Sequence, residues 1–175
     1  MRTLYLLRHA KSSWSDNTLT DHDRPLSSRG RRDAPRMAAF MASLGMAPDL
    51  VLCSTSMRTR QTLELLRQGL DLDAVEVSFE PAIYEVPPSH LTARVRSLPD
   101  DRKAVLVIGH NPGMQGAALD LIADGDPNLI RGLATKYPTC ALAAISFDAA
   151  SWADVRAASG RLDHFVRPAD LPEGT

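Results

Sequence analysis

Two histidines and two arginines stand where strands are expected to end, and these residue types can hold and attack a phosphate. Arg8 and His9 follow the apolar run at residues 3–7, and His110 follows a second run at residues 104–108. Arg58 comes soon after a third run, at residues 49–53. Ligands of open α/β sheets bind outside the carboxyl ends of the strands. We therefore expect these four side chains to meet at one edge of a sheet.

The four residues together favour phosphoryl transfer. Guanidinium groups hold phosphate oxygens through forked hydrogen bonds. A neutral His9 between Arg8 and Arg58 can attack phosphorus and carry the phosphoryl group covalently. A protonated His110 can offset the charge that develops on the phosphoryl oxygens. Arg58 is expected in the first turn of a helix, where a cation is unfavourable unless it points at a bound anion.

Neither a metal nor a cofactor is expected for this chemistry. The sequence contains no glycine-rich phosphate loop of the Walker type and no pair of aspartates typical of a magnesium site. A zinc site built on His9 and His110 is an alternative, but no pair of ligands has helical spacing and the arginines would repel a cation. A second alternative is that His110 only satisfies a hydrogen bond in a turn.

Apolar runs alternate with amphipathic stretches along the chain. The predicted strands are residues 3–7, 49–53, 74–79, 104–108 and 141–147, with a shorter run at 162–166 as an edge strand. Four helices are predicted. Two of them span residues 31–44 and 113–123. A third begins near Met57 and is capped by one of residues 54–56, and a fourth follows Pro88 and is capped by Ser89. Pro35 predicts a kink in the first helix or a helix start close to it.

This order of elements predicts a three-layer α/β/α sandwich around a mainly parallel, mixed sheet. The 175 residues are expected to form one domain over residues 1–166, followed by a flexible tail at residues 167–175. The polar segment 11–28 is expected to be a loop of functional importance or high mobility. Cys53 and Cys140 lie in apolar runs and are expected to be buried, small hydrophobic residues.

The net charge argues against binding of nucleic acid, and the lengths of the apolar runs argue against a membrane-spanning segment. A net charge of −1 argues against non-specific binding of nucleic acid, which needs a basic face. No run reaches the roughly 18 apolar residues that span a membrane. The first residues enter a strand directly, without the pattern of a signal peptide, so we expect a cytoplasmic location.

Five segments, in order and with matching spacing, resemble the histidine phosphatase superfamily, which has the phosphoglycerate mutase-like fold. Within that superfamily, the SixA-type phosphohistidine phosphatases are the most similar branch. The matching segments are LYLLRHAK at residues 4–11, DRPLS at 23–27, RG at 29–30, STSMRTRQT at 54–62 and VIGHNPG at 107–113. Ala10 stands where the wider superfamily commonly has glycine, as in the SixA-type branch.

The resemblance implies a role for each matched residue. His9 would be the phosphorylated nucleophile, and Arg8, Arg58 and His110 would form the phosphate pocket. Arg24 is a weaker candidate for a contact with substrate. The acid that protonates the leaving group is the least certain part.

Two carboxylates, Glu80 and Glu85, lie in the segment where relatives acting on alcohol esters carry their acid. Of the two, Glu85 is preferred. The SixA-type branch does not rely on a fixed acid there, so a solvated role for either carboxylate is an equal alternative.

We therefore expect a metal-independent phosphatase that forms a covalent phosphohistidine. A chain of 175 residues has little length for a lid, and the resulting open pocket suits a phosphohistidine carried by a protein domain. The alternatives are a phosphatase or mutase acting on small phosphomonoesters and a non-catalytic module that binds phosphate. The sequence leaves the physiological substrate, the pathway and the oligomeric state open.

Overall fold

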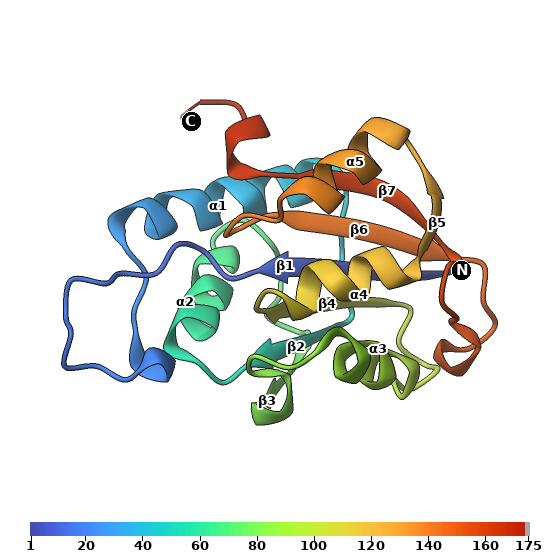
Figure 1. Ribbon diagram of the computed structural model, residues 1–175, viewed down its shortest axis with the longest axis horizontal. Coiled ribbons are helices and arrows are strands. Elements are labelled where there is room, and N and C mark those ends of the chain that lie inside the picture. The colour runs from blue at the N-terminus through green and yellow to red at the C-terminus, as the bar shows by residue number, and fades with distance from the viewer. Residues whose placement is uncertain (174–175) are drawn as a thin grey trace.

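A seven-stranded sheet forms the centre of the molecule. The computed structural model describes residues 1–173. The strands are β1 (Arg2–Arg8), β2 (Leu50–Ser54), β3 (Glu76–Glu80), β4 (Ala104–Gly109), β5 (Ile122–Gly125), β6 (Leu142–Phe147) and β7 (Gly160–Val166). Their order is β3-β2-β4-β1-β6-β7-β5, and β6 alone runs against its two neighbours, β1 and β7. The prediction of a mainly parallel, mixed sheet is confirmed (Figure 1).

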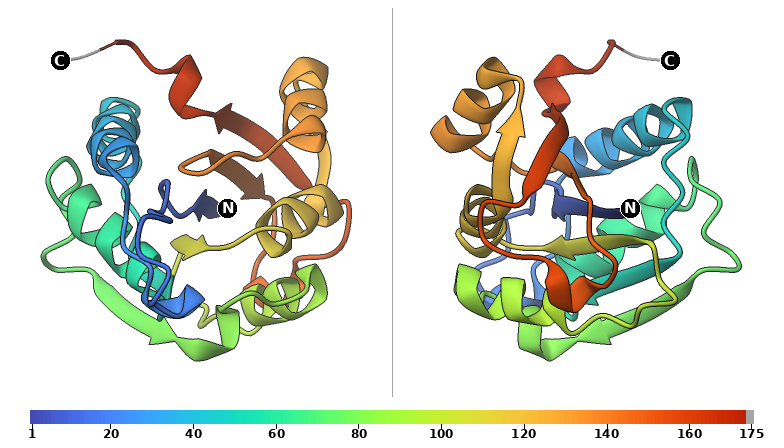
Figure 2. Two further views of the ribbon diagram at one scale, coloured as in Figure 1. Left: turned by 60° about the vertical axis from the view of Figure 1, so that its left-hand side comes forward. Right: turned by 90° about the vertical axis from the view of Figure 1, so that its right-hand side faces the viewer.

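Helices cover both faces of the sheet. They are α1 (Ser28–Ser43), α2 (Met57–Leu66), α3 (Pro88–Arg96), α4 (Gly113–Leu121) and α5 (Pro127–Thr135). Helices α1 and α2 lie on one face, and α3, α4 and α5 lie on the other, as the views in Figure 2 show. This arrangement confirms the predicted three-layer sandwich. None of the helices in residues 1–173 has the length and apolar character needed to cross a membrane.

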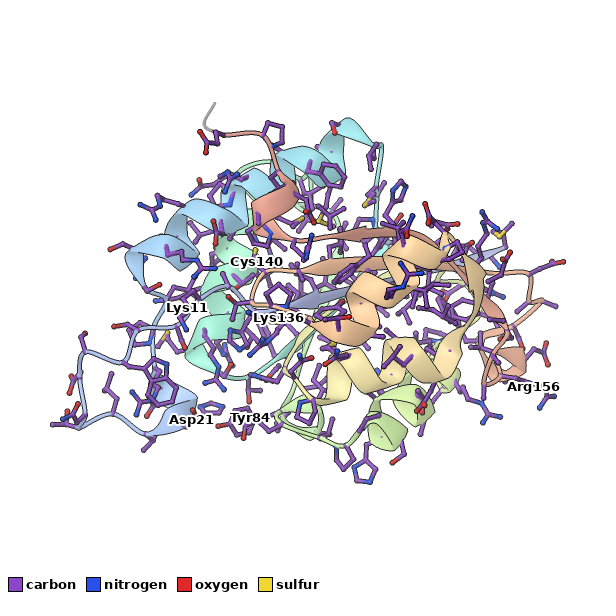
Figure 3. All side chains as sticks on the ribbon, turned by 45° about the horizontal axis from the view of Figure 1, so that its top comes forward. Lys11, Asp21, Tyr84, Lys136, Cys140 and Arg156 are labelled. Atoms are coloured by element: carbon purple, nitrogen blue, oxygen red, sulfur yellow. The ribbon has the colours of Figure 1, made fainter. Side chains whose placement is uncertain are left out.

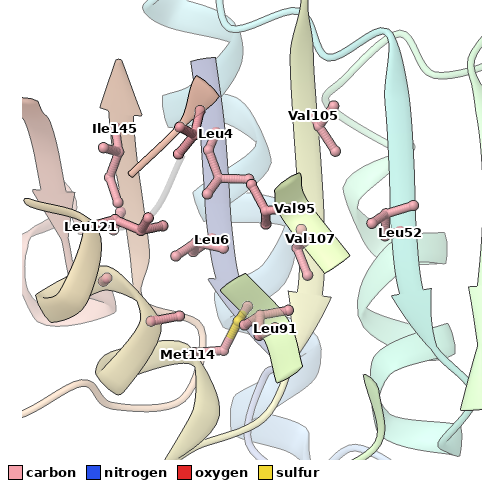
Figure 4. Packing of buried hydrophobic residues seen from close by; sticks show 14 of the residues in the cluster. Leu4, Leu6, Leu52, Leu91, Val95, Val105, Val107, Met114, Leu121 and Ile145 are labelled. Carbon is pink, nitrogen blue, oxygen red and sulfur yellow. The ribbon is translucent and has the colours of Figure 1, made fainter. Parts of the chain in front are cut away.

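The alternation of side chains along the strands divides the core in two. Leu4 and Leu6 of β1 belong to the cluster that includes residues of α3 and α4, and Figure 4 shows Leu6 on the same side of the sheet as Leu91 and Met114. Tyr5 and Leu7 point to the other face, where they join the cluster formed by α1 and α2. A central strand buried on both faces positions its last residues firmly.

Several elements differ from the sequence prediction. The strand at Gly160–Val166 is not an edge strand, because β5 pairs with its outer side. Neither β5 nor α5 is predicted by the sequence. Ser89 is not the N-cap of α3; Pro87 takes that position and Pro88 opens the helix, where a proline without an N–H is well tolerated. Helix α1 begins at Ser28 and runs through Pro35.

The segment after Val166 packs on the fold, in contrast to the predicted flexible tail. A short 3₁₀ helix forms at Pro168–Asp170, and Leu171 is buried in the α1–α2 side of the core. The Arg36 guanidinium donates hydrogen bonds to the carbonyls of Leu171 and Pro172, at 3.2 and 3.0 Å. Residues 174–175 of the predicted tail lie outside the described residues.

Candidate active site

The ends of three parallel strands meet at one edge of the sheet and open into a cavity of about 280 Å³. Strand β1 pairs with β4 up to Arg8 and Gly109, and β4 pairs in turn with β2. The residue after each of β1 and β4 is a histidine, so His9 and His110 lie with ring centroids 5.3 Å apart. The cavity is lined by Arg8, His9, Lys11, Ser12, Trp14, Asp21, Arg58, Glu85, His110, Asn111 and Thr139. The structure therefore brings together the four residues expected from the strand ends, and Glu85 with them.

The backbone around His9 is fixed on both sides. The carbonyls of Arg8 and His9 both accept a hydrogen bond from the backbone N–H of Cys140, at 3.1 and 2.9 Å. The Ala10 N–H donates to the Thr62 hydroxyl at 3.0 Å, and that hydroxyl donates to the Arg58 carbonyl at 2.7 Å. The backbone directly after His9 is thus linked to the backbone of Arg58 through the Thr62 hydroxyl.

The His9 ring has one defined tautomer. Its Nδ1 lies 2.7 Å from the Ala10 carbonyl oxygen, which can only accept, so Nδ1 carries the proton. Nε2 is left with a free lone pair. Burial lowers the pKa of His9 to about 3, and the nearby Arg58 and Arg8 charges act in the same direction. At neutral pH the ring is uncharged and can act as a nucleophile.

Arg58 enters the cavity from the first turn of α2. The Ser56 hydroxyl caps this helix by accepting from the Thr59 N–H, which confirms a cap within residues 54–56. Arg58 is 4% exposed, and its guanidinium donates to the Asp21 carbonyl at 2.7 Å and to Asp21 Oδ2 at 3.0 Å. Its Nη2 also lies 3.3 Å from Glu85 Oε1. Two carboxylates, those of Asp21 and Glu85, thus form ion pairs with this cation.

Arg8 keeps donor capacity for a ligand. One Nη donates to the Tyr137 carbonyl at 3.0 Å, and Nε is buried with no hydrogen-bond partner in residues 1–173. Burial, and then the Arg58 charge, lower the pKa of Arg8 from its usual value. An anion placed between Arg8 and Arg58 would relieve this repulsion.

His110 contacts both Arg58 and β2. Its Nδ1 lies 3.4 Å from Arg58 Nη2, which can only donate, so Nε2 carries the proton and donates to Ser54 Oγ at 2.7 Å. The pKa of His110 is lowered to about 3, chiefly by burial and then by the nearby His9 and Arg58, which act in the same direction. The ring is therefore neutral in the free protein. A protonated His110, as the sequence hypothesis requires, would need the charge of a bound phosphate.

Asp21 is the charged pocket residue in contact with Arg58 that the sequence did not predict, and the lining residues Lys11, Ser12, Trp14, Asn111 and Thr139 were not predicted for the site either. Asp21 begins a short 3₁₀ helix, Asp21–Asp23, and its Oδ2 accepts a hydrogen bond from the Tyr84 hydroxyl at 2.5 Å (Figure 3). The Tyr84 hydrogen bond, and then Arg58, lower the pKa of this carboxyl. The only signal in the sequence was a carboxylate in a long polar loop that follows the Arg-His pair. Asp23 shares that position, so the sequence could not choose between them.

Glu80 and Glu85 have different environments. The Arg94 guanidinium holds Glu80 through two close contacts, at 2.6 and 2.9 Å, and Glu80 does not line the cavity. Glu85 lines the cavity with its side chain 52% exposed, and its backbone has a positive φ of 50°. A positive φ is uncommon outside glycine and aligns this carboxylate with the pocket at some local cost. The preference for Glu85 over Glu80 agrees with the geometry.

Arg24 does not line the cavity. Its guanidinium carbon lies 3.8 Å from the centroid of the Trp14 ring, and it is Trp14 that lines the cavity. The expected contact between Arg24 and substrate stays a prediction, and the cavity residue that Arg24 contacts is Trp14. Arg60 donates to the Thr55 carbonyl and lies over Phe79 at the surface.

Two other kinds of site come into question among the described residues: a metal centre and a second hollow. In residues 1–173 no group of three or more His, Cys, Asp or Glu is arranged to hold a metal ion. A larger hollow, of about 560 Å³, lies between α1 and the C-terminal segment, but none of the four strand-end residues lines it. The cavity at the strand ends alone combines paired arginines with a nucleophile in the described part of the chain.

Comparison with known proteins agrees with this geometry. The sequence profile of the histidine phosphatase superfamily (branch 1) matches residues 4–92. The chain belongs to this superfamily.

Relatives of this histidine phosphatase are found in plants and bacteria. An uncharacterised chloroplastic protein of Arabidopsis thaliana is 36% identical over 95% of this chain and 78% of its own length. An uncharacterised protein of Mycobacterium tuberculosis is 34% identical over 93% of this chain and 99% of its own.

Solved structures agree with the fold and the branch. A presumed phosphohistidine phosphatase SixA from Nakamurella multipartitia has a TM-score of 0.82 and 30% identity, covering 95% of this chain and 96% of its own. A presumed SixA from Agrobacterium tumefaciens has a TM-score of 0.80 and 26% identity, covering 95% and 98%. The phosphoglycerate mutase-like fold and the SixA-type resemblance are confirmed, and the chain is a phosphatase of this superfamily.

Proposed function

We propose that this phosphatase hydrolyses phosphohistidine, and that His9 carries the phosphoryl group between the two halves of the reaction. The observation that carries the proposal is the His9 tautomer. With Nδ1–H bonded to the Ala10 carbonyl, the lone pair of Nε2 is free in a cavity lined by Arg8 and Arg58. A module that only binds phosphate has no use for a histidine fixed in this form.

In the first half of the reaction, Nε2 attacks phosphorus and a bond forms between them. The bond from phosphorus to the leaving group breaks, and the leaving group takes its electron pair. His110 takes up a proton from solvent when the negatively charged phosphoryl group binds, and Arg8, Arg58 and this protonated His110 then hold the phosphoryl oxygens as charge develops on them. In the second half, water attacks phosphorus, the bond to Nε2 breaks, and phosphate leaves with His9 returned to its neutral form.

A protein side chain is the favoured carrier of the phosphoryl group. The cavity has a volume of about 280 Å³ and is lined in part by residues of the segments 9–27 and 81–87. The SixA proteins of similar fold are described as phosphohistidine phosphatases, which supports the same substrate class here. The partner would then be a protein domain that carries phosphohistidine.

A second candidate is a phosphatase for small phosphomonoesters. Glu85 and Asp21 in the cavity favour it, because an alkoxide leaving group needs a proton more than an imidazole does. Asp21 is held ionised by Tyr84 and Arg58, so Glu85 is the better placed of the two to supply that proton.

The test is hydrolysis of phosphoramidate, a phosphohistidine peptide and p-nitrophenyl phosphate by wild type and His9→Ala. We expect His9→Ala to fall below roughly a thousandth of the wild-type rate, as for other lost nucleophiles. Mass spectrometry of the reacting wild type should show one phosphoryl group on His9 that is lost in acid. Undiminished turnover by His9→Ala would exclude the covalent mechanism, and no turnover of any substrate by wild type would favour a binding module.

A further inference from the structure

A tryptophan stands exposed at the mouth of the cavity. Trp14 is 61% exposed, although the other tryptophan of the chain, Trp152, is fully buried. Large aromatic side chains are costly to leave in water, and they are common at recognition sites. Trp14 lines the same cavity as His9.

Arg24 holds the indole from one side. Its guanidinium lies 3.8 Å from the ring centroid, a distance suited to a cation–π contact. Within residues 1–173 the Nε of Arg24 is buried without a hydrogen-bond partner. Trp14 lines the cavity and Arg24 does not. Because Trp14 is 61% exposed beside this contact, the indole keeps free surface for a ligand.

The direction of the reaction brings the leaving group to this ring. Attack by His9 Nε2 requires the leaving group to depart from the opposite side of phosphorus. Of the residues that line the cavity, His9 is only 6% exposed whereas Trp14 is 61% exposed, so we infer that the side opposite His9 is the solvent side, where Trp14 lies.

We propose that Trp14, fixed by Arg24, contacts the leaving group and selects substrates whose leaving group carries a planar ring, such as the imidazole of phosphohistidine. Selection of substrates during turnover rests on the proposed hydrolysis of phosphohistidine. The contact between Trp14 and a bound ring does not depend on that hydrolysis.

The first test compares two substrates that differ in the ring. N-phosphoimidazole releases imidazole, and phosphoramidate releases ammonia. Trp14→Ala is expected to lose about fivefold more kcat/KM on N-phosphoimidazole than on phosphoramidate, the size of one aromatic contact. Trp14→Phe should keep most of the ring preference.

Phe79 offers a matched control. It is also an exposed aromatic residue under an arginine, with Arg60 at 4.4 Å, but it does not line the cavity. Phe79→Ala should leave the ratio of the two kcat/KM values unchanged. Equal losses on both substrates in Trp14→Ala would overturn selection of the ring during turnover.

Binding of inert analogues separates this proposal from the proposed function. Calorimetry should show that wild type prefers phenylphosphonate to methylphosphonate and that Trp14→Ala loses about fivefold of this preference. If wild type hydrolyses neither substrate but shows a Trp14-dependent preference, the hydrolytic function fails and the ring contact stands. A preference that is the same in Trp14→Ala as in wild type would overturn the proposal.

Discussion

At the scale of single residues, the two pocket histidines link function to acid stability. Burial lowers the pKa of both His9 and His110 to about 3, whereas a histidine in an unfolded chain titrates near 6.5. Between these values the unfolded chain binds more protons than the folded one, so acid favours unfolding. The same burial that keeps His9 nucleophilic thus costs stability as pH falls.

We predict that the free energy of unfolding decreases as pH falls from 6.5 towards 3, by up to about 1.4 kcal/mol per pH unit for each histidine. His110→Asn should show a shallower slope than wild type over this range, whatever its stability at pH 7. Urea unfolding at several pH values measures the slope. His90→Asn, which changes an exposed histidine, is the control and should keep the wild-type slope. Parallel curves for wild type and His110→Asn would contradict the prediction.

The two pocket carboxylates should behave differently when they are neutralised. Glu85→Gln is expected to reduce kcat by roughly 10²-fold on an alkyl phosphate such as β-glycerophosphate, but little on p-nitrophenyl phosphate, whose leaving group needs no proton. Asp21→Asn should reduce both rates together, because it removes the negative charge that pairs with Arg58 at Asp21 Oδ2, although the hydrogen bond from Arg58 to the Asp21 backbone carbonyl is unchanged. Rates on both substrates measure the difference. The assignment of Glu85 as the acid fails if its loss is independent of the leaving group.

At the scale of elements, the start of α1 is fitted closely to the loop that follows the nucleophile. A Cβ placed on Gly30 would lie 2.2 Å from the Lys11 carbonyl oxygen, which also accepts hydrogen bonds from the N–H and the hydroxyl of Ser27. Gly30→Ala must therefore push α1 or residues 10–12 away. This close approach explains the glycine of the Arg-Gly motif at residues 29–30.

We predict that Gly30→Ala lowers both the melting temperature and the rate, with a loss of stability of about 2 kcal/mol or more, as for overpacked sites. Gly132→Ala is the matched control. Gly132 lies inside α5, and a Cβ there meets only Phe165, at 3.8 Å. Alanine at that position should stabilise the helix by about 0.5–1 kcal/mol. Thermal unfolding and phosphoramidate hydrolysis check both variants, and equal melting temperatures would contradict the account of Gly30.

The sequence predicted the elements that carry the site better than those that do not. Strands β1, β2 and β4 are buried on both faces, so they appear as unbroken apolar runs, and their ends located Arg8, His9 and His110. By contrast, β5 has only four residues and contains Asp124 and Gly125, so no periodicity marks it. Asp21 reaches Arg58 across 37 residues through a loop, and such a contact has no local pattern.

At the scale of the whole molecule, the C-terminal segment contributes to the core and lies apart from the cavity. Leu171 is 5% exposed among residues of α1 and α2, and it does not line the catalytic pocket. A substitution at Leu171 should therefore lower the free energy of unfolding without changing the catalytic rate.

We predict that Leu171→Ala lowers the free energy of unfolding by about 2–3 kcal/mol, towards the low end for a buried leucine, because the site lies near the end of the chain. Below the unfolding transition, kcat/KM on phosphoramidate should stay at the wild-type value. Leu119→Ala removes a leucine that is 40% exposed and should cost less than about 0.5 kcal/mol. Urea unfolding and steady-state rates measure the two effects. A Leu171→Ala variant as stable as wild type would show that the segment after Val166 is a free tail, because a detached leucine buries no surface that its removal could expose.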